Sequence, residues 1–301
     1  MPMTFAEILG EPIPPIEILD VGAMLEDGAD RYVGLVSQGL AHVTGFEPNR
    51  QEFQRLSKRP GPYRYLPLFL GDGKEATFHI TNYPGCSSLL EPNSDVIDLF
   101  QTMDAIPDFG NFYVKAREQV QTTRLDDVVP AVRGDLLKID IQGAELMVLQ
   151  NGRKVLGQTL VLETEAEFVP LYRDQPLFGD LHSFLRSQGF MLHKLIDCGG
   201  RPFEGVNAQN PFAPVSQLMW ADAIFVRDFS SLEAYGDDDL IKAAAILHVV
   251  YQSYDLVALL LREHDRRQGR GLWSKYAAWL ETVELPSTAV TAKFRVTTGR
   301  V

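Results

Sequence analysis

The stretch Ile16-Glu-Ile-Leu-Asp-Val-Gly22 decides the fold class of this 301-residue chain. It is a short, mostly apolar run rich in branched residues, and a glycine closes it. Runs of this kind are typical of a buried strand in a parallel sheet. We therefore predict a strand here, preceded by an irregular segment that contains Pro12, Pro14 and Pro15.

Strands and helices alternate after this first strand. Branched and aromatic runs closed by Gly, Pro or Asn predict strands, and the segments between them predict helices. The predicted order is strand 16–22, helix 31–38, strand 42–47, helix 51–58 and strand 63–70. This alternation predicts an α/β fold with a doubly wound, mostly parallel sheet and right-handed crossovers.

The middle of the chain is less regular before the pattern returns. The sequence of residues 73–121 predicts a β-rich insertion. A weak alternation of apolar and polar residues over 112–125 predicts a long edge strand. Buried-strand patterns return over 135–140 and 159–163. The last two predicted strands, 190–196 and 219–226, would form an antiparallel hairpin around a loop rich in Gly and Pro.

The composition changes after Arg227. Residues 240–262 are dense in Ala, Leu, Val and Ile, and residues 271–283 are amphipathic. We expect one domain over 1–230 and a helical extension over 231–301. Because apolar helix faces need a partner, these helices would pack either on the same chain or on a second copy in a homodimer.

Charge and cysteine content exclude several classes of protein. There are 28 Lys and Arg against 40 Asp and Glu, so the net charge is −12. Such a chain lacks the clustered bases that bind nucleic acid phosphates or anionic membranes. Two cysteines are too few for a disulfide scaffold or a four-cysteine zinc site. With no apolar run of ~20 residues and no signal peptide, we expect a cytoplasmic protein without a membrane span.

Acidic residues and a glycine follow the first two predicted strands. Asp20 and Gly22 end the first strand, and Glu47 ends the second. In open α/β sheets, ligands bind at the carboxyl ends of the strands, where a glycine permits close approach and a carboxylate binds ribose hydroxyls. These residues predict a nucleoside ligand, although Gly22 alone also fits a simple turn and Glu47 alone an exposed charge.

The loop after the first strand distinguishes between nucleoside ligands. A dinucleotide site needs G-x-G-x-x-G, whereas this loop runs Gly22-Ala-Met-Leu-Glu-Asp-Gly28. Glu26 and Asp27 would repel a pyrophosphate. An acidic loop suits S-adenosylmethionine, which carries a sulfonium and an ammonium but no phosphate.

A second acidic position follows the central strand. Asp140 would lie at the cleft, where it could accept a proton from a substrate hydroxyl, bind an ammonium group or hold a divalent cation; it could also merely cap a helix. Glu163 ends the neighbouring strand and would face the same cleft. Glu165 and Glu167 follow that strand and are expected to be solvated.

These residues lie within sequence motifs of a known family. The run Leu137-Lys-Ile-Asp-Ile-Gln-Gly-Ala-Glu-Leu-Met-Val-Leu-Gln-Asn-Gly152 resembles the signature of the FkbM family of S-adenosylmethionine-dependent methyltransferases. The resemblance covers residues 16–227. Further stretches that fit it in order are Asp20-Val-Gly-Ala23, Gly45-Phe-Glu-Pro-Asn49, Ser87-Ser88-Leu89, Thr123-Arg-Leu-Asp-Asp127, Val161-Leu-Glu163, Phe168-Val-Pro-Leu-Tyr172 and Gln175-Pro-Leu-Phe178.

The resemblance implies a class I methyltransferase sheet of seven strands with the last one antiparallel. It also implies methyl transfer to an oxygen of a small metabolite, a sugar or a glycan. The chain departs from the family at Met24, where an asparagine is usual, and at Gly28, which comes late. The residues to which we assign roles are Asp140 and Glu163 for catalysis, Asp20, Gly22, Ala23, Glu47, Asp72, Gly73 and Asp140 for the cofactor, and Ser87 and Ser88 for the acceptor.

Alternatives remain for both the function and the base. No metal ligands are assigned. His79, His182 and His193 are alternative general bases, although a lone histidine is more often a packed or surface residue. A catalytically degenerate nucleoside-binding or docking module would keep the same fold. A nicotinamide oxidoreductase would share the strand order and Glu47 but would need the missing glycines.

Overall fold

The main sheet of the protein has seven strands. The computed structural model describes residues 3–24, 30–128 and 134–283. Strands β1, β2, β3, β7 and β8 run parallel, and β10 lies antiparallel between β8 and β9. This arrangement confirms the class I methyltransferase sheet expected from the sequence. The spatial order is β3 (Tyr63–Leu66), β2 (Ala41–Phe46), β1 (Ile16–Val21), β7 (Leu136–Ile139), β8 (Val161–Glu167), β10 (Trp220–Arg227) and β9 (Phe190–Gly199).

A second sheet is built from the β-rich insertion. Its order is β4 (Phe69–Leu70), β6 (Val114–Thr123) and β5 (Glu75–Thr81). The predicted strand 63–70 is split, because Pro67 follows β3 and has no N–H to donate to the ladder. The predicted edge strand 112–125 is instead the middle strand β6; most of its side chains are nevertheless exposed, which explains its weak alternation.

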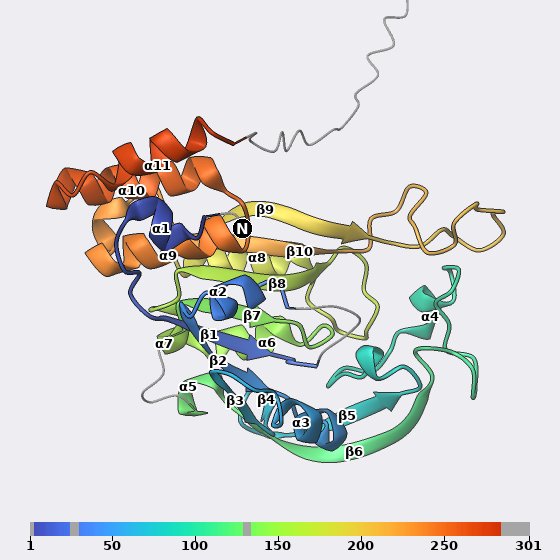
Figure 1. Ribbon diagram of the computed structural model, residues 1–301. Coiled ribbons are helices and arrows are strands. Elements are labelled where there is room, and N and C mark those ends of the chain that lie inside the picture. The colour runs from blue at the N-terminus through green and yellow to red at the C-terminus, as the bar shows by residue number, and fades with distance from the viewer. Residues whose placement is uncertain (1–2, 25–29, 129–133, 284–301) are drawn as a thin grey trace, which may run out of the picture.

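Helices cover both faces of the main sheet (Figure 1). One hydrophobic core joins the sheet to α1, α2, α9, α10 and α11, and a second joins it to α5, α6, α7 and α8. The first group is α1 (Phe5–Leu9), α2 (Val33–Ser37), α9 (Asp237–Val249), α10 (Tyr254–Gln268) and α11 (Leu272–Leu280). The remaining helices are α3 (Arg50–Leu56), α4 (Ser94–Ile97), α5 (Leu125–Val128), α6 (Glu145–Gln150), α7 (Arg153–Leu156) and α8 (Phe178–Ser187), with short turns η1 (Pro84–Cys86) and η2 (Leu232–Ala234).

The C-terminal helices pack on their own chain. The segment 243–247 of α9 is fully buried in the core that it shares with β1, β7, β8 and β10. Its three consecutive alanines allow close approach to the sheet. Within the described residues, no helix has both the length and the apolar character needed to span a bilayer.

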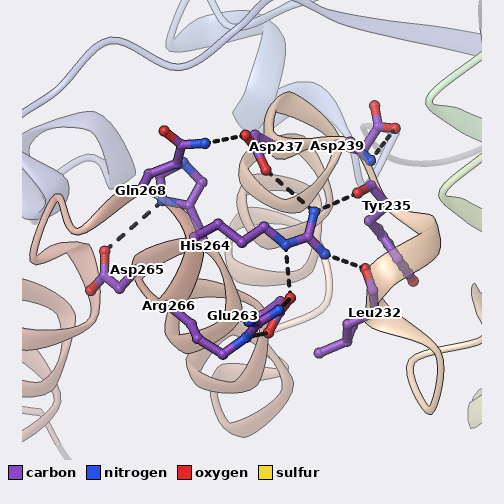
Figure 2. Close-up of polar contacts among 11 residues, drawn as sticks. Leu232, Tyr235, Asp237, Asp239, Glu263, His264, Asp265, Arg266 and Gln268 are labelled. Carbon is purple, nitrogen blue, oxygen red and sulfur yellow. Dashed lines mark hydrogen bonds and ion pairs between the residues drawn. The ribbon is translucent and has the colours of Figure 1, made fainter.

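One arginine fastens α10 to the start of the helical extension. The Arg267 guanidinium donates to the carbonyl oxygens of Tyr235 and Leu232 at 2.7 and 2.6 Å. It also contacts the carboxylates of Glu263 and Asp237. Figure 2 labels these two residues and the two residues whose carbonyls accept, Leu232 and Tyr235. Five N–H donors in a rigid fork suit this role, because they bind two carboxylates and two carbonyls together.

Candidate active site

A cavity of about 860 Å³ opens at the carboxyl ends of β1, β2, β7 and β8. The second sheet contributes part of its wall through Phe69, Phe78 and Ile80. Carboxylates outnumber cations in the described lining. The carboxylates are Asp30, Glu47, Glu118, Asp140, Glu163, Glu165, Asp197 and Asp222, and the cations are Arg31, Arg50, Lys115 and Lys138.

Gly22 brings the loop after β1 against the loop after β7. Its φ is +81°, and a Cβ there would lie 1.9 Å from the carbonyl oxygen of Asp140. The Asp140 amide donates to the Val21 carbonyl at 3.0 Å. The amides of Gly22 and Ala23 both donate to Phe46 at 3.1 Å, so these contacts tie together the ends of three strands. Gly22 lines the cavity, whereas Ala23 is buried behind it.

Glu47 is a buried carboxylate on the cavity wall. It follows β2, is 5% exposed and accepts a hydrogen bond from the Asn49 amide at 2.7 Å. Burial raises the pKa of Glu47 to about 7, because the amide bond offsets only part of the cost of desolvating the charge. The carboxylate can therefore change its ionisation near neutral pH.

Asp140 and Glu165 share one amide donor. Gln142 Nε2 lies 3.0 Å from Asp140 Oδ1 and 3.0 Å from Glu165 Oε2. Gln142 has a φ of +61°, and its side-chain oxygen accepts from the Tyr172 hydroxyl at 3.2 Å. Burial and the neighbouring Asp140 charge hold the pKa of Glu165 well above its usual range. The arrangement favours the protonated form of Glu165.

The expectation that Glu165 and Glu167 are solvated is wrong. Strand β8 continues to Glu167 because β10 pairs with it along its whole length. Glu167 is 2% exposed, and Glu165 lines the cavity beside Asp140. The sequence showed only the apolar start of the strand, whereas its extent depends on a partner strand far along the chain.

Glu163 has both carboxylate oxygens engaged. Oε1 accepts from the Arg31 guanidinium, and Oε2 accepts from the Tyr251 hydroxyl at 2.7 Å. Arg31 also pairs with Asp197 and Asp222. Glu163 therefore fixes a cation on the cavity wall, and its oxygens are not available to take a substrate proton without losing these contacts.

Asp20 lies behind the cavity wall and reaches the cavity through a lysine. It is 1% exposed and accepts from the Tyr32 hydroxyl at 2.6 Å. Lys138, which does line the cavity, donates to its other oxygen at 3.3 Å. A ligand in the cavity would thus meet Lys138 rather than Asp20.

The two predicted acceptor residues have different places. Ser87 lines the cavity, and its hydroxyl accepts from the Thr81 amide at 3.1 Å. Ser88 is 1% exposed, and its hydroxyl donates to the Gln142 carbonyl at 2.7 Å. Ser88 therefore supports the unusual backbone of Gln142 from behind.

Asp72 and Gly73 are not among the lining residues that the structure describes. They follow β4, which has left the main sheet, and the Asp72 carboxylate pairs with Lys74 at 2.9 Å. In the segment directly after β3, the residues that line the cavity are Leu68, Phe69 and Leu70. The displacement follows from the break at Pro67 between β3 and β4.

Comparison with known proteins assigns the chain to a family. The model of the methyltransferase FkbM domain matches residues 20–192, which is more than half of the chain. The chain belongs to the FkbM methyltransferase family. The match begins at Asp20, near the end of β1, and includes β2, β7 and β8, so it covers the strand ends that form the cavity. Membership of this family argues against the alternative that the chain is a nicotinamide oxidoreductase.

One curated relative and two solved structures illustrate the similarity. The 2-O-methyltransferase NoeI of Sinorhizobium fredii (strain NBRC 101917 / NGR234) is 27% identical over 169 residues, 54% of this chain and 68% of that protein. An FkbM methyltransferase from Methylobacillus flagellatus KT is 13% identical, covers 70% of this chain and 43% of its own, and has a TM-score of 0.37. The magnesium protoporphyrin IX methyltransferase of Synechocystis PCC 6803 is 10% identical, covers 71% of each chain and has a TM-score of 0.34.

Among the residues that the structure describes, none of the three candidate histidines lines the cavity. His79 is 8% exposed on β5, and His182 on α8 contacts the rings of Phe178 and Phe225. His193 hydrogen-bonds to Ser253, and burial lowers its pKa to about 4. In the described parts of the chain, no group of three or more His, Cys, Asp or Glu could hold a metal.

Sequence reasoning missed Arg31, Gln142 and Tyr251. The partners of Arg31 are 132 to 191 positions away, so no local pattern marks it. Gln142 stood inside the quoted signature but carried no charge to single it out. Met24 lines the cavity, whereas Glu26, Asp27 and Gly28 lie outside the described residues, and so does the chain after 283.

Proposed function

We propose that this chain transfers a methyl group from S-adenosylmethionine to a hydroxyl oxygen of a sugar, a glycan or a secondary metabolite. One observation carries the proposal: Gly22, Glu47 and Asp140 converge on an acid-lined cavity at the carboxyl ends of three adjacent strands. Family membership supports methyl transfer. The oxygen as acceptor atom is supported by the relative NoeI, which is a 2-O-methyltransferase.

The residues of the cavity fit this cofactor. Its excess of carboxylates suits a ligand that carries a sulfonium and an ammonium, because opposite charges attract strongly in a partly desolvated site. Glu47 would accept hydrogen bonds from the two ribose hydroxyls. Gly22 would let the backbone approach the cofactor, and Asp140 would face its ammonium or the acceptor. We assign Asp20 and Ala23 supporting roles behind the wall.

Asp140 would act as the general base. Bound S-adenosylmethionine supplies a methyl group on a positively charged sulfur. Gln142 holds Asp140 Oδ1 at 3.0 Å, and in the described structure no hydrogen bond is made to Oδ2. Oδ2 would accept the acceptor's hydroxyl proton as that oxygen bonds to the methyl carbon, while the methyl carbon's bond to sulfur breaks and its electron pair stays on the neutral thioether product. A protonated Glu165 would add no second negative charge beside Asp140.

The experiment that tests this function identifies the methylated atom. The full chain is incubated with S-adenosylmethionine labelled with ¹³C in its methyl group and a panel of free and lipid-linked sugars. We expect an O-methyl ether, detected by NMR. Asp140→Asn should lower the rate about 10²–10⁴-fold while the cofactor still binds. An N-, S- or C-methyl product would refute the proposed acceptor class, and binding without transfer across the panel would favour the degenerate module.

A further inference from the structure

Within its described residues, 231–283, the helical extension contacts the cavity wall through Tyr251. Tyr251 lies between α9 and α10 and is 5% exposed. Its hydroxyl donates to Glu163 Oε2 at 2.7 Å, on the wall of the cavity. Its carbonyl accepts from Lys194, and the nearby Ser253 hydrogen-bonds to His193, both on β9. These hydrogen bonds hold the segment between α9 and α10 against the sheet, and they fix the position of the Tyr251 hydroxyl.

Opposite charges alternate across the sheet at the same level. Asp20, Lys138 and Glu163 are register partners on β1, β7 and β8. Arg31 continues the row from Glu163 to Asp222 on β10. All members of the row except Asp20 line the cavity, and the row holds three carboxylates and two cations. Its net charge therefore depends on the ionisation of Glu163.

Neighbouring groups favour the ionised form of Glu163 against the effect of burial. This residue is 4% exposed, and burial raises its pKa, an effect that the Asp222 charge reinforces. Arg31, the Tyr251 hydroxyl and Lys138 oppose that effect. Tyr251 is the one neutral donor in this set, so removing its hydroxyl changes no formal charge and weakens the ionised form of Glu163 alone.

We propose that Tyr251 is a positioning residue through which the helical extension keeps Glu163 ionised and paired with Arg31, so that the cavity favours a positively charged cofactor over its neutral product. The inference rests on the proposed function, because it assumes that S-adenosylmethionine occupies this cavity. Loss of the hydroxyl would leave Glu163 Oε2 without its donor. The carboxyl group would then bind a proton more readily, and the negative charge of the wall would fall.

The test compares two ligands that differ in charge at sulfur. S-adenosylmethionine is a sulfonium, and S-adenosylhomocysteine is a neutral thioether. Tyr251→Phe should weaken binding of the first about tenfold, which is the worth of a hydrogen bond to a charged group, measured by calorimetry at pH 7. Binding of the second should change by no more than about twofold.

A matched control exists in the same extension. Tyr235 is 3% exposed and donates to the Arg227 carbonyl at 2.6 Å, away from the cavity. Tyr235→Phe also removes a buried hydroxyl but should leave the ratio of the two affinities unchanged. An unchanged ratio in Tyr251→Phe, or an equal fall in Tyr235→Phe, would overturn the inference.

Two further results complete the test. If Tyr251→Phe does not fold, Glu163→Gln keeps an acceptor for the Tyr251 hydroxyl but removes the charge, and it should show the same selective loss. An unaltered ratio in Glu163→Gln would overturn the inference. If the unaltered chain does not bind S-adenosylmethionine, the proposed function fails and this inference with it. Binding by that chain without selective loss in the variants rejects the inference alone.

Discussion

One face of the main sheet carries two different surfaces along its length. In its amino half, Ile16, Ile18, Leu136 and Val161 pack in the core with α9. In its carboxyl half, the next residues with the same orientation on these strands are Asp20, Lys138 and Glu163. The α9 side of the sheet is thus a packing surface at one end and the charged wall of a cavity at the other.

The two halves of this face have different roles: the apolar amino half supports the fold, and the charged carboxyl half forms the cavity wall. Apolar burial in the amino half stabilises the fold, at roughly 25 cal/mol per Å² of apolar surface removed from water. Desolvation raises the pKa of Glu47, Glu163 and Glu165 in the carboxyl half, so ionising these carboxyl groups costs free energy. Apolar truncations in the amino half should therefore lower stability, and variants in the carboxyl half should weaken ligand binding.

The largest expected effect comes from removing a buried side chain that packs on the amino half of the sheet. Leu247 on α9 is fully buried against the sheet, so Leu247→Ala should lower the free energy of unfolding by about 2–5 kcal/mol, measured with urea. Leu259 on α10 is 39% exposed, so Leu259→Ala should change the free energy of unfolding by less than about 0.5 kcal/mol. A loss of cofactor affinity in folded Leu247→Ala would show that the two halves are not separable.

The next effect comes from separating two loops of the carboxyl half. A Cβ at Gly22 would overlap the Asp140 carbonyl, so Gly22→Ala should weaken cofactor binding about 100-fold or more by moving the loops apart. Gly39 also has a positive φ, +71°, but nothing lies within 4 Å of a Cβ there. Gly39→Ala carries the same backbone strain and should bind the cofactor normally. Equal losses in both variants would count against the close approach.

Glu47→Gln should give a smaller effect with a defined pH dependence. With a folded pKa of about 7 against 4.5 unfolded, the folded state holds the extra proton between those values, so stability falls as pH rises through this window. Glu47→Gln should therefore be more stable than the parent by about 1–3 kcal/mol at pH 8 and equal to it at pH 4, in urea titrations.

The same variant tests the ribose contact. An ionised carboxylate is the better acceptor for two hydroxyls, so binding of S-adenosylmethionine by the parent should strengthen from pH 6 to pH 8. Glu47→Gln should bind about tenfold more weakly at pH 8 and lose this pH dependence. Unchanged affinity at pH 8 would remove Glu47 from the ribose site.

Local patterns predicted the sheet and the positions at its edge. The ends of buried parallel strands meet at one edge, so Gly22, Glu47, Asp140 and Glu163 could be brought to one cavity from their strands alone. The resemblance to the FkbM signature added the class I methyltransferase sheet of seven strands. Each of these inferences depends on residues close together in the sequence.

Features that depend on distant partners could not be predicted. Where β8 ends is set by its pairing with β10, which buries Glu167. Arg31 and Tyr251 reach Glu163 from segments 132 and 88 positions away. Asp72 was misplaced for a local reason, since Pro67 diverts the chain into the second sheet. Side-chain partners across the sheet are a property of packing rather than of spacing.

The central claim is that this cavity binds S-adenosylmethionine, and calorimetry on the full chain tests it most directly. S-adenosylmethionine and NAD would be titrated separately at pH 8. The account predicts that S-adenosylmethionine binds with a Kd below about 1 mM, in the usual working range of enzymes, and that NAD does not bind. No heat from S-adenosylmethionine at about 1 mM, or tighter binding of NAD, would contradict it.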